Sequence, residues 1–184
     1  MFIHDQQRLE FFQRDEQEEV DILFLGDSLI ERFDTGTYFP EYRTANRGID
    51  GDTVSGVLRR FDESLNVAVV HNHILLIGIN DTLDACKHYE TLMKRVRERY
   101  QDAKIFALAL LPVGGVYSEY NRTAIKANAI IQDAAKKCGA TFLNARPILQ
   151  DEDGELKEEF TVDGVHLNSQ GYEKLAEFIR NSLL

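Results

Sequence analysis

The sequence predicts an α/β fold built around a mostly parallel β-sheet. Three short apolar runs of strand length recur along the 184-residue chain, at residues 21–26, 73–78 and 104–111. The segments between them carry apolar residues at helical spacing. Strands that are apolar on both faces and alternate with amphipathic helices are typical of parallel sheets covered by helices. A chain of this length fits one domain, residues 1–184.

The first half of the chain predicts two strands and two helices. Residues 5–18 are polar with large apolar side chains interspersed, which indicates a helix. Residues 21–26 form an unbroken apolar run, which indicates a buried strand, and residues 42–47 form a weaker strand. Residues 53–62 have apolar side chains at helical spacing and therefore predict a second helix.

The second half repeats the alternation of strands and helices. Its helices each carry one apolar stripe, and its strands are short and apolar. The expected elements are, in order, a strand at 73–78, a helix at 84–100, a strand at 104–111, a helix at 121–138, a strand at 141–144 and a closing helix at 168–183.

Charge and hydrophobicity exclude several classes of partner. The formal net charge of −10 argues against nucleic acid and against docking on an anionic membrane surface. No apolar run approaches the roughly 20 residues of a membrane span, and no signal peptide is visible. Cys86 and Cys138 lie in no metal-binding spacing, which is typical of thiols in a reducing compartment. We therefore expect a cytoplasmic protein without a membrane anchor.

Small and polar residues gather where the predicted strands end. Gly26-Asp27-Ser28 ends the first strand, residues 46–51 follow the second and residues 78–81 follow the third; residues 163–166 precede the last helix. Each segment alone is typical of a turn or a helix cap. Ligands of parallel sheets bind outside the carboxyl ends of the strands. Together the four segments supply a serine, a histidine, aspartates, an asparagine and glycines, which is the set that acyl transfer requires.

These segments resemble the four sequence blocks of the GDSL, or SGNH, hydrolases. The motifs are GDSL at 26–29, NRGIDGDT at 46–53, GIND at 78–81 and DGVHLN at 163–168. The resemblance extends from the first strand to the last helix. It implies a three-layer α/β/α sandwich with a flavodoxin-like, five-stranded, mostly parallel sheet. It also implies a serine esterase or acylhydrolase that uses no cofactor and no metal.

Carried over position by position, the resemblance implies the roles of five residues. Ser28 would be the nucleophile, His166 the general base and Asp163 the residue that orients it. The oxyanion hole would consist of the backbone N–H groups of Ser28 and Gly48 and the side-chain amide of Asn80. The chemistry is consistent, because a neutral imidazole can take the serine proton and preorganised donors stabilise the charge that develops on the carbonyl oxygen.

The remaining polar residues are given structural interpretations. Asp27 and Asp81 are expected to be supporting residues that bond nearby backbone N–H groups and hold the loops. The histidines outside the motifs are interpreted as surface or strand-edge residues: His4, His71, His73 and His88.

For the substrate, the sequence favours a small ester with a short acyl group, acetyl above all. The chain has little room for a lid, and its motifs look closest to family members that act on acetylated small molecules, including platelet-activating-factor acetylhydrolase-like proteins. Lysophospholipase and thioesterase activities remain alternatives, as does a homodimer. Two other classes also stay open. One is a non-catalytic binding protein, and the other is a Mg²⁺-dependent phosphoryl-transfer enzyme that uses Asp27, Asp50, Asp52, Asp81 and Asp163.

Overall fold

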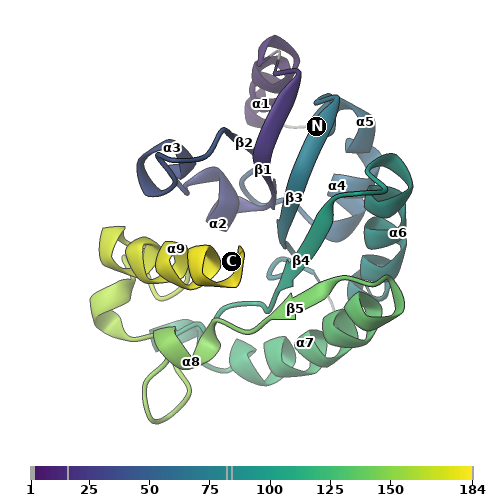
Figure 1. Ribbon diagram of the computed structural model, residues 1–184. Coiled ribbons are helices and arrows are strands. Elements are labelled where there is room, and N and C mark those ends of the chain that lie inside the picture. The colour runs from purple at the N-terminus through teal and green to yellow at the C-terminus, as the bar shows by residue number, and fades with distance from the viewer. Residues whose placement is uncertain (1–2, 16, 82, 84, 184) are drawn as a thin grey trace.

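A five-stranded sheet forms the centre of the computed structural model, which describes residues 3–15, 17–81, 83 and 85–183. Its order is β2-β1-β3-β4-β5, and every pair is parallel (Figure 1). This is the flavodoxin-like order of doubly wound folds. The strands are β1 (Glu19–Gly26), β2 (Thr44–Gly48), β3 (Val69–Leu76), β4 (Lys104–Leu108) and β5 (Thr141–Leu143).

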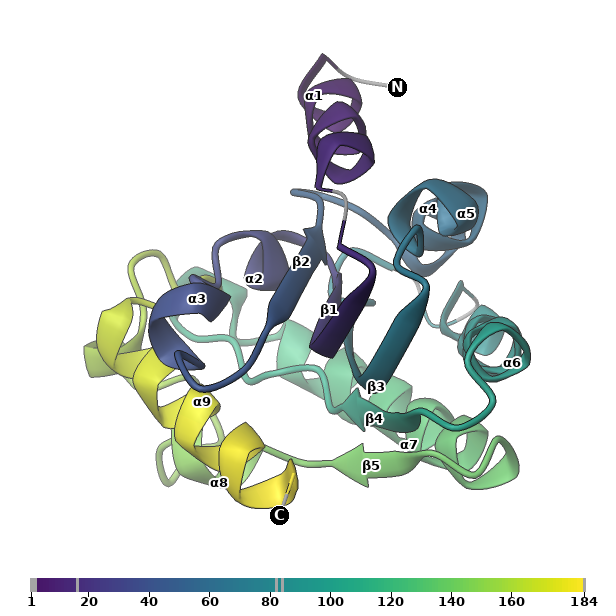
Figure 2. The same ribbon diagram turned by 45° about the horizontal axis from the view of Figure 1, so that its top comes forward.

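Helices cover both faces of the sheet, so the molecule has three layers (Figure 2). One layer consists of α4 (Val54–Arg59), α5 (Phe61–Ser64), α6 (Tyr89–Arg99) and α7 (Tyr120–Lys137). The opposite layer consists of α2 (Ser28–Glu31), α3 (Thr35–Tyr38), α8 (Arg146–Leu149) and α9 (Ser169–Leu183). The first helix, α1 (Ile3–Arg14), packs against α5. The described residues also include three 3₁₀ turns: η1 (Ala85–His88), η2 (Gly115–Tyr117) and η3 (Glu158–Phe160).

The strands bury side chains on both faces of the sheet. Leu23 and Leu25 of β1 face the core under α4 to α7, whereas Ile22 and Phe24 face the core under α2 and α9. Successive residues of a strand point to opposite faces, so a strand covered on both sides must be apolar throughout. The unbroken apolar runs of the sequence therefore have a direct structural cause.

The strand ends are aligned at one edge of the sheet. Gly26 of β1 lies beside Gly48 of β2 and beside Leu76 of β3. The loops that follow these three strands consequently leave the sheet side by side. The predicted fold class is confirmed, and the expected location of a site at this edge follows from the register.

Several element boundaries differ from the expectation. The first helix ends at Arg14, and the helix expected at 53–62 is broken at Arg60, whose backbone is not helical. β4 ends at Leu108 because the Asn128 side chain bonds both the N–H and the C=O of Leu110. Residue 84, where another helix was expected to start, lies outside the described residues.

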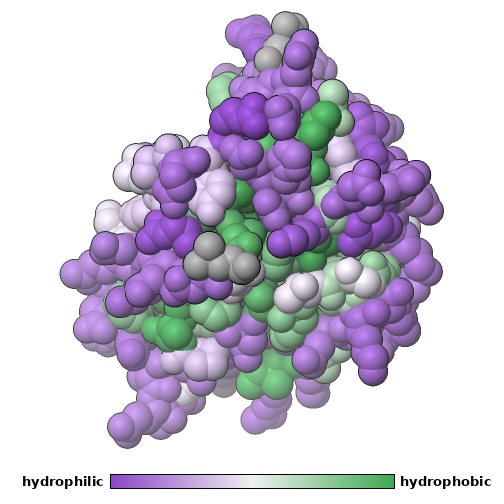
Figure 3. Space-filling model, viewed as in Figure 1, coloured by the Kyte–Doolittle hydropathy of each residue, from purple (hydrophilic) through white to green (hydrophobic). Residues whose placement is uncertain are grey.

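The surface has both hydrophilic and apolar parts. The face drawn in Figure 3 is mostly hydrophilic, with smaller apolar patches. Within the described residues, no helix is long and apolar enough to cross a membrane.

His73 corrects one of the structural interpretations. It is fully buried in β3, whereas His4, His71 and His88 are exposed as expected. Neither ring nitrogen of His73 has a hydrogen-bond partner in the described part of the chain, and the ring lies 4.7 Å from that of Tyr100. Burial, with a smaller contribution from the charge of Arg97, lowers its pKa to about 3. The folded protein therefore holds this ring neutral.

Replacing His73 by Phe should remove part of the acid sensitivity of folding. The unfolded chain binds a proton at His73 below about pH 6.5, and the folded chain does not until about pH 3, so protonation favours unfolding between these values. We expect urea unfolding between pH 7.5 and 4.5 to show a growing advantage of His73→Phe in the free energy of unfolding. The difference from the wild type should increase by up to about 1.4 kcal/mol for each unit by which the pH falls. A constant difference between the two proteins would contradict this account.

Candidate active site

Ser28 lies at the turn between β1 and α2. Asp27 is the N-cap of α2, and its Oδ1 accepts the N–H of Leu29 at 3.0 Å. The turn is tight, because a Cβ at Gly26 would lie 2.1 Å from the carbonyl oxygen of Leu76. The glycine of the GDSL motif is therefore required by packing, and it places Ser28 directly at the sheet edge.

Ser28, His166 and Asp163 form one hydrogen-bonded chain. His166 Nε2 lies 2.9 Å from Ser28 Oγ, and His166 Nδ1 lies 2.7 Å from Asp163 Oδ2. The other oxygen of Asp163 accepts the backbone N–H groups of Val165 and His166. An aspartate on Nδ1 favours the tautomer that leaves Nε2 free to accept the serine proton.

Hydrogen bonds keep Asp163 ionised. Burial raises the pKa of this carboxyl, but bonds from the backbone N–H and ring of His166 and from the N–H of Val165 outweigh it and lower the pKa to about 2. The negative charge is therefore present beside the imidazole across the physiological range.

The loop that carries Asp163 and His166 is pinned in two ways. Thr161 Oγ1 donates to the carbonyl oxygen of His166 and accepts the N–H of Gly164. The carbonyl oxygen of Gly164 accepts the N–H of Gly114 at 2.8 Å. Gly164 has φ +89°, and a Cβ there would lie 2.5 Å from the Gly114 carbonyl oxygen, so the motif needs glycine at this position.

Gly48, one of the expected oxyanion donors, makes other contacts in the structure. The N–H of Gly48 donates to Asn46 Oδ1 at 3.0 Å, and a Cβ at Gly48 would lie 2.1 Å from the backbone nitrogen of Glu31. The N–H of Gly48 thus already has an acceptor, and the residue is packed beneath α2. The second expected donor, the N–H of Ser28, makes no hydrogen bond within the described residues.

Gly51 offers a free N–H that the sequence reasoning missed. It lies in the same NRGIDGDT motif, is exposed, and has φ +70° with open space where a Cβ would be. Its N–H makes no hydrogen bond in the part of the chain that the structure describes. The signal available in the sequence was the second glycine of that motif, at a turn that calls for positive φ.

Asn80 is hydrogen-bonded to the residue that follows Gly51. Its Nδ2 donates to the carbonyl oxygen of Asp52 at 2.9 Å. A primary amide carries two N–H groups, so one fixes the side chain and the second is available to a ligand. The exposed Asn80 amide and the Gly51 N–H are therefore neighbouring donors at the sheet edge.

Asp27 and Asp81 both accept backbone N–H groups, as expected of supporting residues. Asp81 Oδ2 accepts the N–H of Val54 at 2.9 Å, which ties the loop after β3 to the start of α4. Asp27 is completely buried, and its Oδ2 has no hydrogen-bond partner among the described residues. Burial, reinforced by the charge of Asp52, raises the pKa of Asp27 to about 7 although the Leu29 N–H opposes the shift.

The other acidic side chains at this edge have partners of their own. Asp52 forms an ion pair with the buried Arg60 at 2.7 Å, and Asp50 lies 3.6 Å from Arg32. No three histidine, cysteine or acidic side chains are grouped to hold a metal ion within the described ranges. The five aspartates that could have formed a Mg²⁺ site are therefore engaged in separate interactions.

Comparisons with known proteins agree with the fold and the motifs. The model of the GDSL-like lipase/acylhydrolase family matches residues 24–174. The human platelet-activating factor acetylhydrolase IB subunit alpha2 is 25% identical over 172 residues, an alignment that covers 86% of this chain and 74% of that protein.

Two solved structures extend the comparison. A "putative platelet activating factor" from Streptococcus pneumonia superposes with a TM-score of 0.90 at 27% identity and covers 98% of this chain and 93% of that one. The acetylxylan esterase Axe2 from Geobacillus stearothermophilus has a TM-score of 0.70 at 17% identity, with 90% of this chain and 94% of that one covered. At this low identity, the second likeness shows the shared fold alone.

The variant Asp27→Asn should change the pH dependence of stability in the opposite direction to His73→Phe. The Asp27 carboxyl has a pKa near 3.8 in the unfolded chain and near 7 in the folded one. The free energy of unfolding of the wild type therefore decreases as the pH rises through this window. An amide cannot ionise. In urea unfolding, the free energy of unfolding of the variant should therefore rise relative to that of the wild type from about pH 4 to 7. The difference should stay constant above about pH 7. A stability difference between the two proteins that does not change with pH would contradict the raised pKa of Asp27.

Proposed function

The chain belongs to the GDSL-like lipase/acylhydrolase family of carboxylic ester hydrolases, and we propose that it hydrolyses small, short-chain esters through an acyl-serine intermediate on Ser28. The observation that carries this proposal is the continuous hydrogen-bonded chain from Ser28 through His166 to Asp163. Its order and its distances fit the activation of a serine hydroxyl by a neutral imidazole.

In the proposed first step, Ser28 Oγ attacks the ester carbonyl while His166 Nε2 takes its proton. Asp163 stabilises the imidazolium through Nδ1 and keeps the ring oriented. His166 then gives the proton to the departing alcohol. In the second step, His166 takes a proton from water, which hydrolyses the acyl group from Ser28, and the proton returns to the serine.

We assign the oxyanion hole to the N–H groups of Ser28 and Gly51 and to the side-chain amide of Asn80. The support is that each has a hydrogen not committed to another acceptor within the described residues, whereas the N–H of Gly48 bonds Asn46. Donors fixed before the reaction stabilise the developing charge without reorganising. Gly51 thus takes the role that the sequence motif suggested for Gly48.

A small cavity lined by Ile79 and Asp81, the residues on either side of Asn80 in the sequence, supports a short acyl group. It measures about 20 Å³ and is lined on one side by Gly78, Ile79 and Asp81 and on the other by Leu110 and the start of α7. A cavity of this volume has room for one or two groups of about the size of a water molecule. The methyl group of an acetyl ester is a group of that kind. A relative that is 25% identical to this chain is named as a platelet-activating factor acetylhydrolase, in agreement with an acetyl substrate.

A longer acyl chain is the second candidate, because apolar side chains are exposed near the same cavity. Val116 and Tyr117 of η2 and Tyr120 at the start of α7 are all exposed, and Tyr120 also lines the cavity. This surface would receive the chain of a lysophospholipid or a fatty acyl thioester. The two candidates differ in their dependence of rate on acyl length.

Removing the nucleophile should abolish hydrolysis. Ser28→Ala should lower kcat/KM for p-nitrophenyl acetate by about 10³-fold or more, while the remote Ser182→Ala should stay within about twofold of wild type. A p-nitrophenyl ester series from acetate to laurate then measures the acyl pocket, and we expect the highest rate with acetate. Equal rates for Ser28→Ala and wild type would disprove the serine mechanism.

Removing one oxyanion donor should slow the chemical step. Asn80→Ala should lower kcat by about 10²–10³-fold with little change in KM, because the amide is needed chiefly in the transition state. Asn80→Asp keeps the shape but replaces the donors by a negative charge, so it should be at least as slow. An Asn80→Ala variant with wild-type kcat would remove Asn80 from the oxyanion hole.

A further inference from the structure

Glu31, at the end of α2, contacts the loop that carries Gly51. We call residues 49–53 the oxyanion loop. Glu31 Oε2 accepts the backbone N–H of Asp50 at 2.6 Å, one residue before Gly51. The Glu31 side chain is 17% exposed, whereas Asp50, at the other end of the bond, is exposed. A charge-assisted bond of this length is among the stronger hydrogen bonds in proteins.

The oxyanion loop is anchored at both ends but has few other contacts at its tip. Ile49 donates its N–H to the carbonyl oxygen of Gly26, and the Asp52 carboxylate pairs with Arg60. Asp50 and Gly51, between these anchors, are exposed. The Arg32–Asp50 ion pair at 3.6 Å joins two half-exposed side chains and is expected to contribute little. The tip is also closed by a hydrogen bond from the N–H of Asp52 to the carbonyl oxygen of Ile49 at 3.1 Å. The bond from Glu31 is the hydrogen bond that we find, within the described residues, between the tip and another element.

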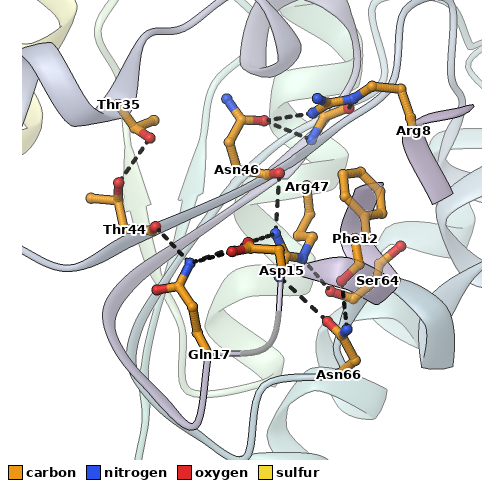
Figure 4. A network of polar contacts seen from close by, with 11 residues as sticks. Arg8, Phe12, Asp15, Gln17, Thr35, Thr44, Asn46, Arg47, Ser64 and Asn66 are labelled. Carbon is orange, nitrogen blue, oxygen red and sulfur yellow. Dashed lines mark hydrogen bonds and ion pairs between the residues drawn. The ribbon is translucent and has the colours of Figure 1, made fainter. Parts of the chain in front are cut away.

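The first helix holds Glu31 in turn. His4 Nε2 lies 2.9 Å from Glu31 Oε1, and Arg8 Nε lies 3.8 Å from the same oxygen. Arg8 also donates to the carbonyl oxygen of Gly48 and to Asn46 Oδ1, as Figure 4 shows for Asn46. One arginine of α1 thus contacts both Glu31 and the end of β2 from which the oxyanion loop departs.

The α1 helix is itself firmly docked. Phe12, its one buried residue, lies with its ring centroid 5.0 Å from the guanidinium carbons of both Arg8 and Arg47. Arg47 is fully buried and pairs with Asp15 at 2.7 Å, just after the helix (Figure 4). The α1 residues precede the 24–174 segment that the family model matches, so this support comes from outside the shared motifs.

We propose that Glu31 is a positioning residue for catalysis: held by His4 and Arg8, its carboxylate fixes the Asp50–Gly51 turn so that the Gly51 N–H faces the oxyanion. This inference rests on the proposed function. The pairing of Glu31 with Arg8 also has an electrostatic effect. A bare carboxylate near a developing oxyanion would raise the energy of the transition state, and the positive charge of Arg8 offsets it.

The test compares three substitutions of Glu31 that separate the effect of its side-chain length from the effect of its charge. Glu31→Gln keeps an oxygen for the Asp50 N–H but loses the charge, Glu31→Asp keeps the charge but is too short, and Glu31→Ala loses both. We expect Glu31→Ala and Glu31→Asp to lower kcat for p-nitrophenyl acetate by about tenfold or more with KM within about twofold. Glu31→Gln should stay within about threefold of wild type.

Two controls make the outcome decisive. Arg32→Ala removes the exposed ion pair to Asp50 without touching its N–H and should leave kcat within about twofold of wild type. Ser28→Ala, measured in parallel, tests the proposed function separately. If Ser28→Ala is inactive but Glu31→Ala and Glu31→Asp keep wild-type kcat, the positioning role alone is overturned. An equal loss in Glu31→Gln and Glu31→Ala, or a change confined to KM, would overturn it too. Should Glu31→Ala fail to fold, Glu31→Asp and Glu31→Gln decide the question.

Discussion

The site depends on how closely α2 packs against the ends of the central strands. A side chain at Gly26 would collide with the backbone of Leu76, and one at Gly48 would collide with the backbone of Glu31. Glycine at these two positions lets the helix begin directly at the sheet edge. The same close approach sets Ser28 at the start of α2 and brings Glu31, one turn later, within reach of the loop after β2.

Buried polar groups then join the three loops at this edge. Arg60 donates to the carbonyl oxygen of Gly26, to Ser64 Oγ and to the Asp52 carboxylate, while the Asp52 carbonyl oxygen accepts from Asn80. A buried guanidinium is costly unless its donors are satisfied, and here each end of the fork finds an acceptor. The donors that we propose for the oxyanion hole are thereby held in place by contacts within the protein, which is the arrangement that preorganised electrostatic catalysis needs.

The features that could be predicted are those that follow from the type and the spacing of residues close together in the sequence. The apolar runs predicted the parallel sheet, and the spacing of Asp163 and His166 fits the short turn observed between them. The sequence was less informative about Gly48 and Gly51, because two glycines in one motif differ only in backbone angle and in what their N–H groups bond. His73 was misplaced for a different reason. It is the first residue of the predicted strand at 73–78, whereas the observed strand begins at Val69 and therefore contains His73 in its interior.

The hydrogen bond between Ser28 and His166 joins residues 138 positions apart, from opposite ends of the chain. During synthesis, the serine and its turn leave the ribosome long before the histidine exists. A partly made chain therefore carries an unactivated hydroxyl and cannot turn over esters by the proposed route. By the proposed mechanism, hydrolysis requires that residues 163–166 have been made and have folded against the start of α2.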